Sequence, residues 1–494
     1  MGLQATATAQ TPFGSTVFPS TVQRSGMSTR VIVVGAGLAG LVAARHLAAG
    51  GTDVTVLERR ESVGGRVRSR ERQGFRLDRG FQVLFTAYPA VQRELDLEAL
   101  DLRRFAPGAI VAAENHRSTL ADPLRDPQAL PATLTNPNVS VGDALRVARL
   151  RLAVGRSDPE TIFEGSDESI ASFLADRGFS DRFVDRFLAP FYGGITLDRS
   201  LSTSSHVFEY TFRALATGST AVPAAGMAAV PAQLADRVRE AGGDLETGVA
   251  VESVSSEGDG ATVTTADGTS EVNAVVVATD PPTARRLTGV DGIPTAGRGC
   301  VTQYYRLPES VAPETGKRLL LNADGDAVAA GREPNHVVPH GEVAPEYAPD
   351  DETLLGAVYL EARGESTDSS KNGDASDSEA VGTGNAVDST AEPTVVDADD
   401  ATLAERTRRT LESWYPERRF DALEHLHTDR IPFAQFAQPP GIHDDLPDVR
   451  DPDGPVYLAG EVTRWSSIQG AMESGRQAAR AVIEDRSAGS TAGT

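Results

Sequence analysis

The residues best suited to binding a nucleotide form a glycine cluster near the amino terminus. The motif Gly-x-Gly-x-x-Gly starts at residue 35, after the β-branched run 30–34 and before small and apolar residues at helical spacing over 38–49. The first glycine permits a tight turn, the second lets the backbone approach a diphosphate, and the third allows the helix to pack closely on its strand. The positive amino end of the helix stabilises the bound negative charge. The residues predicted to contact the diphosphate are Gly35, Gly37, Leu38, Ala39 and Gly40.

A carboxylate with the spacing of a ribose ligand follows this cluster. Glu58 ends a second β-branched run, 53–57, and lies eighteen residues after Gly40. At this place a carboxylate accepts hydrogen bonds from the ribose hydroxyls of a dinucleotide, and Arg59 is predicted to lie beside it. The alternative is a plain βαβ turn in which the glycines serve only packing. NAD and FAD both use this arrangement, so the residues that follow must distinguish them.

A glycine pair with an arginine distinguishes the two cofactors. Gly64, Gly65 and Arg66 follow Glu58 after a short loop, in the pattern E-x5-G-G-R-x-x-S that ends at Ser69. This stretch resembles the amino terminus of the FAD-dependent amine oxidase superfamily, which includes monoamine oxidases, protoporphyrinogen oxidases and carotenoid desaturases. The resemblance implies that the glycine pair and the arginine lie along the flavin side of the diphosphate. The alternative, a solvated surface loop, explains neither the pair nor its spacing.

A distant stretch carries the same resemblance independently. The sequence VYLAGEVTRWSSIQGAMESGRQAAR, residues 456–480, resembles the carboxy-terminal flavin motif of that superfamily. The resemblance implies that Glu461, directly after Gly460, binds the ribityl chain. It also implies that a helix begins near Gly470 and Ala471 and points its positive end at the N1/C2=O edge of the flavin, stabilising negative charge there.

Shorter blocks extend the resemblance over most of residues 30–482. They read GFRLDRGFQVL, GMAAVPAQLA, LETGVAVESV, VVVATDPP and IPFAQFAQPPG in chain order. In the third block, the resemblance implies that the backbone of Val249 lies against the adenine. An amino-terminal extension and an acidic insertion lie outside the resemblance.

Departures from the family pattern indicate which branch the chain resembles. Monoamine-type oxidases carry a lysine beside flavin N5, whereas the matching strand here, 297–307, has Cys300 or Val301 at that register and no lysine. Those oxidases also carry a tyrosine just before the terminal helix, where this chain has Ile468. No cysteine lies within 433–436, the region where some members are linked covalently to FAD. The departures argue against the usual amine oxidation and predict noncovalent FAD.

The remaining resemblance is to the desaturase and protoporphyrinogen oxidase branch. In that branch hydride leaves carbon for flavin N5 in an apolar pocket that mainly positions the substrate. The stretch 187–205 is predicted to line this pocket, and no catalytic side chain is predicted. Ordinary core packing is the alternative for its aromatic residues. The residues predicted to line the pocket are Phe191, Tyr192, Tyr304 and Ile468.

Other side chains that could do chemistry lack a familiar pattern. The pairs His425/His427 and His336/His340 belong to no known metal-ligand motif, so they are predicted to be surface or core histidines and no metal is predicted. Cys300 follows a glycine in a strand and is predicted to be a small buried residue rather than a reactive thiol.

The charge balance excludes several classes of partner. The chain has 47 Lys+Arg against 70 Asp+Glu, a net charge of −23, which repels nucleic acid and anionic membrane surfaces. Lys317 and Lys371 are the only lysines, a bias that resembles proteins of salt-accumulating halophiles. The single cysteine excludes an internal disulfide framework and favours a cytoplasmic protein. No apolar run approaches the roughly 20 residues that span a bilayer, so any membrane contact is expected to be peripheral.

Together these segments predict an α/β protein with a doubly wound Rossmann-like FAD-binding domain and a mixed α+β substrate domain. Helices are expected over 141–154 and 169–188, and a β-meander over 244–282. The segment 362–400 is predicted to be a disordered acidic insertion, because its composition cannot bury enough apolar surface. The predicted boundaries are 1–27 for a disordered extension, 28–100, 215–285 and 445–486 for the FAD-binding domain, 101–214 and 286–444 for the substrate-binding domain, and 487–494 for a tail.

The expected reaction is two-electron oxidation of an apolar small molecule, such as an isoprenoid or a tetrapyrrole. The electron acceptor is left open between oxygen and a quinone. Two alternatives remain: a flavin amine oxidase that works without the usual lysine, and a flavin-free binder of prenylated or lipidic ligands, like the prenyl-protein dissociation inhibitors. The intact set of Gly35, Glu58, Arg66 and Glu461 argues against a binder, which has no use for it.

Overall fold

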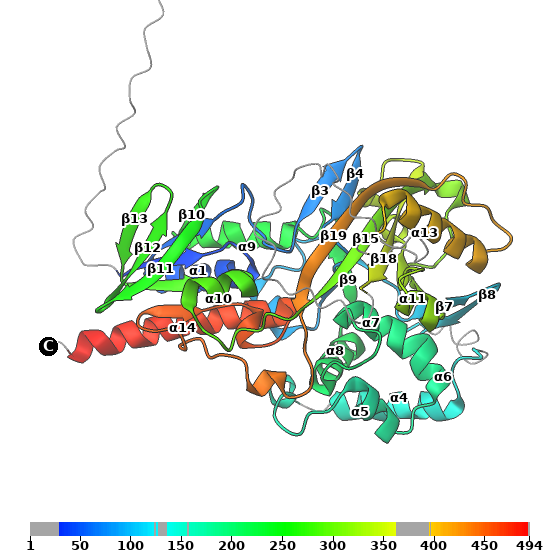
Figure 1. Ribbon diagram of the computed structural model, residues 1–494, viewed down its shortest axis with the longest axis horizontal. Helices are drawn as coiled ribbons and strands as arrows, with labels where there is room; N and C mark the ends of the chain where they lie inside the picture. Colours follow the sequence, from blue (N-terminus) through cyan, green and yellow to red (C-terminus); the bar gives the residue numbers. More distant parts are fainter. Residues whose placement is uncertain are drawn as a thin grey trace, which may run out of the picture.

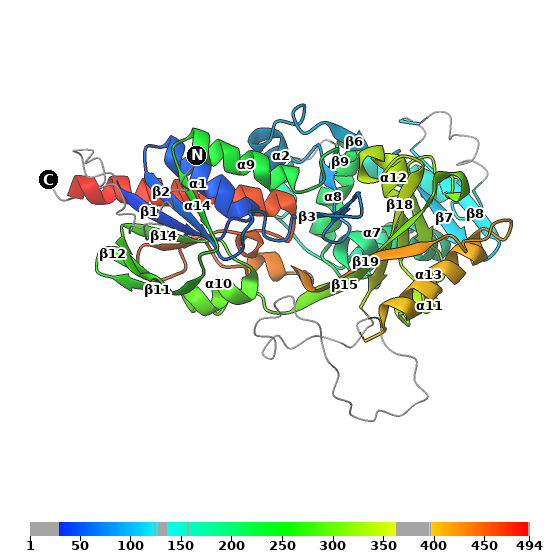
Figure 2. The same cartoon turned by 90° about the horizontal axis from the view of Figure 1, so that it is seen from above.

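The computed structural model describes residues 29–122, 125–126, 136–155, 158–361, 395 and 397–492, with side chains as far as residue 488. The molecule is elongated, with a parallel sheet and its helices at one end and a larger mixed sheet at the other (Figure 1). Two long strands of the mixed sheet, β15 (Gly297–Pro308) and β19 (Glu424–Phe436), run toward the parallel sheet (Figure 2).

The parallel sheet is assembled from three distant parts of the chain. In order across the sheet, its strands are β10 (Asp244–Thr247), β2 (Asp53–Glu58), β1 (Arg30–Val34), β14 (Ala274–Val277) and β20 (Val456–Leu458). The central strands are apolar runs because both of their faces are covered. Side chains of β1 alternate between two hydrophobic clusters, with Val31 and Val33 on one face and Ile32 and Val34 on the other.

Different kinds of element cover the two faces of this sheet. The face of Val31 packs against α1 (Leu38–Ala49), α9 (Ala229–Glu240) and α14 (Ile468–Ala492). The opposite face packs against α10 (Pro281–Thr288) and an antiparallel meander of β11 (Val251–Glu257), β12 (Gly260–Thr265) and β13 (Gly268–Val272). The predicted Rossmann-like sheet and the predicted meander are both confirmed, although strands rather than helices cover most of the second face.

The mixed sheet at the other end has seven strands. In order these are β19, β15, β18 (Glu352–Leu360), β17 (His336–Val338), β16 (Leu319–Asn322), β7 (Ala109–Ala113) and β8 (His116–Leu120). All neighbours are antiparallel except β16 and β7. Helix α13 (Asp400–Trp414) covers one face through Leu403, Leu411 and Trp414. Short helices α11 (Gly325–Ala329) and α12 (His340–Val343) lie in the connections.

A group of helices packs beside this sheet around its own apolar cluster (Figure 1). The predicted helix over 141–154 is confirmed as α4 (Val141–Val154), which a Ser140–Asp143 capping box begins. The single helix predicted over 169–188 is wrong, because Gly178 adopts a positive φ of 74° and Ser180 caps a new helix. The observed elements are α5 (Ile170–Asp176), α6 (Asp181–Phe183), a π-helical turn (Val184–Leu188), α7 (Ala189–Thr196) and α8 (Ser205–Thr217).

Smaller elements join the two ends. The hairpin of β3 (Ser69–Arg72) and β4 (Phe75–Asp78) leads to a three-stranded sheet of β5 (Leu84–Phe85), β9 (Thr220–Pro223) and β6 (Leu102–Arg104), and helix α2 (Pro89–Glu94) follows β5. The buried carboxylate of Asp78 accepts hydrogen bonds from the Ser69 hydroxyl, the Met227 amide and the Tyr347 hydroxyl. Segments far apart in sequence are therefore fixed around one side chain.

Parts of the predicted organisation fall outside the described residues. These are the extension 1–27 and most of the insertion 362–400. The described part of that insertion includes Val395 and Ala398, both 1% exposed and packed in the cluster under α13. Helix α14 continues to Ala492 and so includes most of the predicted tail 487–494. The domain boundaries themselves stay a prediction.

Candidate functional site

The three motif glycines meet different surroundings at the end of β1. A Cβ atom on Gly35, whose φ is 103°, would lie 2.8 Å from the Ala278 carbonyl oxygen. A Cβ atom on Gly40 would lie 2.0 Å from the Gly35 carbonyl oxygen, so this glycine permits the close approach of α1 to its own strand. A Cβ atom on Gly37 would meet nothing within 4 Å. Gly37, at the amino end of α1, therefore borders open space of the kind that a diphosphate requires.

Glu58 is held rigidly at the end of β2. Its Oε2 accepts a hydrogen bond from the Ala36 amide at 2.9 Å, and its Oε1 accepts one from the Arg60 amide at 3.0 Å. The side chain is buried, and each carboxylate oxygen keeps a second lone pair for a ligand hydroxyl. The Val249 amide donates to the Glu58 carbonyl oxygen at 2.9 Å, which places the Val249 backbone beside the backbone of Glu58.

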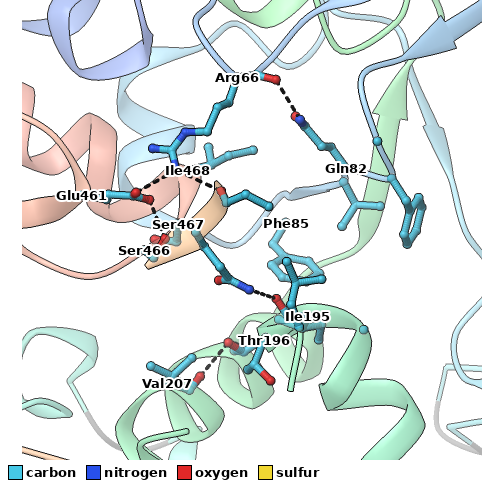
Figure 3. Close-up of a pocket in the computed structure, with 18 of the residues that line it drawn as sticks. Arg66, Gln82, Phe85, Ile195, Thr196, Val207, Glu461, Ser466, Ser467 and Ile468 are labelled. Atoms are coloured by element: carbon cyan, nitrogen blue, oxygen red, sulfur yellow. Dashed lines mark hydrogen bonds and ion pairs between the residues drawn. The ribbon is translucent and has the colours of Figure 1, made fainter. Parts of the chain in front are cut away.

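Arg66 connects the amino-terminal and carboxy-terminal motifs. Its Nη1 donates to Glu461 Oε1 at 2.7 Å and to the Ala434 carbonyl oxygen at 2.9 Å, although 395 positions separate Arg66 from Glu461 (Figure 3). Burial lowers the pKa of Arg66, but the Glu461 carboxylate outweighs this effect and the net pKa is raised. The Gly64 amide anchors the same loop by donating to the Ala36 carbonyl oxygen at 2.8 Å. The two motifs therefore form one site.

The carboxy-terminal motif packs directly on the nucleotide motif. Glu461 also accepts a hydrogen bond from the Ser466 hydroxyl. Helix α14 begins at Ile468, slightly before the predicted start, and a Cβ atom on Gly470 would lie 2.2 Å from the Trp465 carbonyl oxygen. A Cβ atom on Gly475 would lie 2.2 Å from the Ala39 carbonyl oxygen, so only glycine lets α14 cross the first turn of α1.

One cavity of about 1260 Å³ runs through this arrangement. Its volume exceeds the range of about 300–1,000 Å³ that a single drug-sized ligand occupies. Predicted site residues that do not line it are Gly40 and Gly470, which serve packing, and Tyr304, which lies in the core and donates its hydroxyl to the Asp78 carbonyl oxygen at 2.7 Å. The predicted residues that line the cavity are Gly35, Gly37, Leu38, Ala39, Glu58, Arg59, Gly64, Gly65, Arg66, Val249, Gly460, Glu461, Ile468, Ala471, Phe191 and Tyr192.

Most of the cavity wall is apolar. Phe187, Phe191 and Ile195 contribute to its wall from the segment that the sequence assigned to a pocket (Figure 3 shows Ile195). Tyr192 also lines it, and its buried hydroxyl has no hydrogen-bond partner in the described part of the chain. Burial raises the pKa of Tyr192 well above its ordinary value, so this hydroxyl stays protonated and can donate to a ligand.

Several lining residues were missed by sequence reasoning. His336, predicted to be an ordinary surface or core histidine, lines the cavity from β17, and burial lowers its pKa to about 3. Gln82 and Trp465 contribute polar and aromatic surface. Gln82 lies in the block GFRLDRGFQVL and Trp465 in the carboxy-terminal motif, but sequence reasoning assigned neither a role, and His336 lies in no motif. Tertiary structure decides which of these side chains reach the cavity.

The wall contains Cys300 but, among the residues that the structure describes, no lysine. Burial raises the pKa of Cys300 to about 12, so its thiol carries no reactive negative charge at neutral pH. Val301, the other residue considered at this register, is buried in the cluster under α13.

Within the described residues, no helix has both the length and the apolarity needed to cross a membrane.

Comparison with known proteins supports the family resemblance of the sequence motifs. Residues 38–483 match the family model of flavin-containing amine oxidoreductases. The chain is 29% identical to a phytoene dehydrogenase of Streptomyces griseus over 300 residues, which is 53% of this chain and 57% of the relative. It is 30% identical to protoporphyrinogen oxidase 2 of Arabidopsis thaliana over 33% of this chain and 32% of the relative. The chain thus spans little more than half the length of the first relative and a third of the second.

Solved structures share the fold at low sequence identity. A proposed protoporphyrinogen oxidase from Exiguobacterium superposes with a TM-score of 0.65 at 18% identity, covering 93% of this chain and 100% of that one. Cyclohexylamine oxidase from Brevibacterium oxydans gives a TM-score of 0.62 at 16% identity, with coverage of 93% and 100%. With the family match over most of the chain, these findings identify the protein as a member of the flavin-containing amine oxidoreductase family.

Proposed function

We propose that this protein binds FAD noncovalently and oxidises an apolar small molecule by removing hydride from carbon. The observation that carries the proposal is one large cavity, whose lining includes both the dinucleotide cradle and a largely apolar wall. Its size accommodates two ligands in contact, as transfer between a cofactor and a substrate requires.

The cradle residues fit each part of FAD. Open space at Gly37 and the amino end of α1 suit the diphosphate, and the fixed carboxylate of Glu58 suits the ribose hydroxyls. Arg66 and Glu461 would hold the flavin half, with Val249 against the adenine. When bound, FAD would supply the acceptor for one hydride, which carries the two electrons of the oxidation. The chain's own residues bind and orient the two molecules and keep water away.

The walls beyond the cradle favour an apolar substrate over an amine. Phe187, Phe191 and Ile195 form an apolar surface, and no lysine stands among the described lining residues. The similarity to a phytoene dehydrogenase and a protoporphyrinogen oxidase supports a desaturase-like or protoporphyrinogen-oxidase-like reaction on an isoprenoid or a tetrapyrrole. We further propose a cytoplasmic, salt-adapted protein with any membrane contact peripheral, and leave the acceptor open between oxygen and a quinone.

Amine oxidation is the alternative enzyme activity. It rests on short matches, such as 92 residues shared at 42% identity with a putrescine oxidase of Kocuria rosea, which cover 18% of this chain. A flavin-free binder is disfavoured, because the buried Glu461 carboxylate and its Arg66 partner serve no purpose in a purely apolar ligand site.

The testing experiment is spectroscopic. Protein purified in high salt should show flavin absorption bands, and heat should release all of the flavin into the supernatant. Anaerobic addition of a reduced tetrapyrrole or an isoprenoid polyene should then bleach the bands of the holoenzyme, whereas a panel of amines should not. Bleaching by amines alone would establish the amine oxidase alternative, and a colourless protein that takes up no added FAD would establish the binder.

A further inference from the structure

Two histidines and an aspartate from distant segments meet outside the large cavity. Asp167 lies just before α5, His206 in the first turn of α8, and His443 in the short 3-10 helix Ile442–Asp444. One ring nitrogen of each histidine and one carboxylate oxygen all lie within 4.8 Å of one another. The His206 Nδ1 to Asp167 Oδ2 distance is 3.9 Å, too long for a hydrogen bond.

Both histidines have a buried nitrogen without a partner. Nδ1 of His206 and Nδ1 of His443 are inaccessible and make no hydrogen bond with any described residue. The His206 side chain is only 7% exposed, so solvent does not replace the missing partner. An unpaired buried polar atom destabilises the folded protein, and two of them beside a carboxylate require an explanation.

The aspartate is oriented by the segments that carry the two histidines. Asp167 Oδ1 accepts from the Ser204 hydroxyl at 2.8 Å and from the Ser205 hydroxyl at 3.3 Å, directly before His206. Asp167 Oδ2 accepts from the Gly441 amide at 2.9 Å, two residues before His443. Outer hydrogen bonds of this kind fix a ligating carboxylate, and Oδ2, which accepts only one of them, keeps a lone pair for a cation.

We propose that Asp167, His206 and His443 bind one divalent transition-metal ion of the Zn²⁺ class. Two imidazole nitrogens and one carboxylate oxygen suit Zn²⁺, whereas Ca²⁺ and Mg²⁺ prefer oxygen ligands alone. Zn²⁺ binds these atoms at about 2.0–2.2 Å, so small side-chain movements from the present spacing close the site. Three protein ligands leave a position for water. The sequence did not indicate this site, because the three proposed ligands belong to no common local motif.

The site also contacts the wall of the cavity. His443 Nε2 contacts Gln438 Oε1 at 3.4 Å, and the same oxygen accepts from the Ser466 amide at 2.8 Å. Phe163 packs on both histidine rings, at centroid distances of 5.7 Å from His206 and 4.8 Å from His443. A bound ion would therefore fasten α8 and the 3-10 helix Ile442–Asp444 beside the cofactor site without taking part in the proposed reaction.

The test is metal binding by the full chain, stripped with a chelator and dialysed against Zn²⁺ in molar salt. The salt screens attraction of the cation to the acidic surface. Wild type should retain one Zn²⁺ per chain by elemental analysis and gain thermal stability on Zn²⁺ addition. His443→Gln and Asp167→Asn should each bind Zn²⁺ about 100-fold more weakly or worse, since loss of an outer hydrogen bond alone costs 10–100-fold.

His116→Gln is the matched control, because His116 is exposed and remote in sequence from all three ligands. It should bind like wild type. Failure of wild type to bind Zn²⁺, or unchanged binding by His443→Gln, would overturn the proposal. His443 is only partly buried, so this variant tests the site even where a change at buried His206 prevents folding. The readout is independent of flavin content and substrate.

Discussion

Gly37 differs from the glycines beside it, because its missing side chain leaves open space rather than a tight contact. Substitution by tryptophan should therefore fill the diphosphate site without breaking the packing of α1. We expect Gly37→Trp to fold but to retain less than a tenth of wild-type flavin, measured as the ratio of flavin to protein absorbance. Ala49→Trp, at the exposed end of the same helix, is the control and should retain full flavin. A Gly37→Trp protein with normal flavin content would refute the cofactor assignment.

Arg66 and Glu461 depend on each other across the site. The Glu461 side chain is 6% exposed, so removing the guanidinium leaves a buried carboxylate without its partner. Arg66→Met should weaken FAD affinity at least 10-fold, measured by titrating flavin-free protein with FAD. Arg66→Met combined with Glu461→Gln should recover part of the thermal stability lost in the single variant, because no unpaired charge remains. Equal losses in the single and double variants would show that the unpaired Glu461 carboxylate does not destabilise the protein.

Residue identities alone predicted the cofactor cradle better than the substrate pocket. The glycines act through local backbone geometry, and Glu58 and Arg66 stand at short, fixed spacings after them, so a local pattern displays all of these residues. Spacing along the chain did not show that Tyr304 lies away from the cavity. Cys300, four residues earlier on β15, lines the cavity, whereas Tyr304 lies about 13 Å farther along the strand and does not. Which part of a long strand borders a cavity depends on its partners.

A buried carboxylate on helix α2 contacts two basic side chains of helix α1. Glu94 contacts His46 at 3.1 Å and also pairs with Arg45. Burial by itself raises the pKa of Glu94, but the contacts with His46 and Arg45 outweigh it and hold the pKa below its ordinary value. The stabilisation is therefore present above the unfolded pKa of about 4.3 and is lost as pH falls through the lower folded value.

Glu94→Gln should accordingly destabilise the protein by about 2 kcal/mol at pH 7, the usual magnitude for hydrogen bonds to a charged group. The deficit should shrink toward zero below about pH 4. Urea unfolding of both proteins across this pH range measures the difference. Glu98→Gln, at an exposed position after the same helix, should leave the midpoint unchanged at every pH. A deficit that persists at pH 3 would show that the charge of Glu94 is not its cause.

Elements were predictable where one local signal dominated. Helix α4 has the expected bounds because Ser140 and Asp143 form its capping box. The helical pattern over 169–188 instead contains a turn at Gly178, which apolar periodicity hides. The order of strands in both sheets depends on contacts between segments hundreds of residues apart, so local patterns did not indicate it.

The boundary of the acidic insertion can be tested by replacing parts of the insertion with a linker. The sequence places its end at residue 400, but Val395 and Ala398 are buried, and Asp399 caps α13 by accepting from the Thr402 amide at 2.7 Å. Replacing 364–393 by a short Gly/Ser linker should leave flavin content and melting temperature unchanged. Replacing 364–399 should cost about 3 kcal/mol through the lost apolar burial and cap. Equal melting temperatures of the two proteins would show that Val395 and Asp399 contribute nothing.

The joining of the cradle by Arg66 and Glu461, 395 positions apart, also limits when the cradle can form during synthesis. A ribosome makes β1, α1 and β2 first, while β20, Glu461 and α14 emerge only after the whole mixed sheet has been translated. Until then the nascent parallel sheet lacks one edge strand, and the first turn of α1 lacks the helix that crosses it. Flavin therefore has no complete site until the carboxy-terminal motif has been made, and full cofactor loading must follow the synthesis of β20, Glu461 and α14.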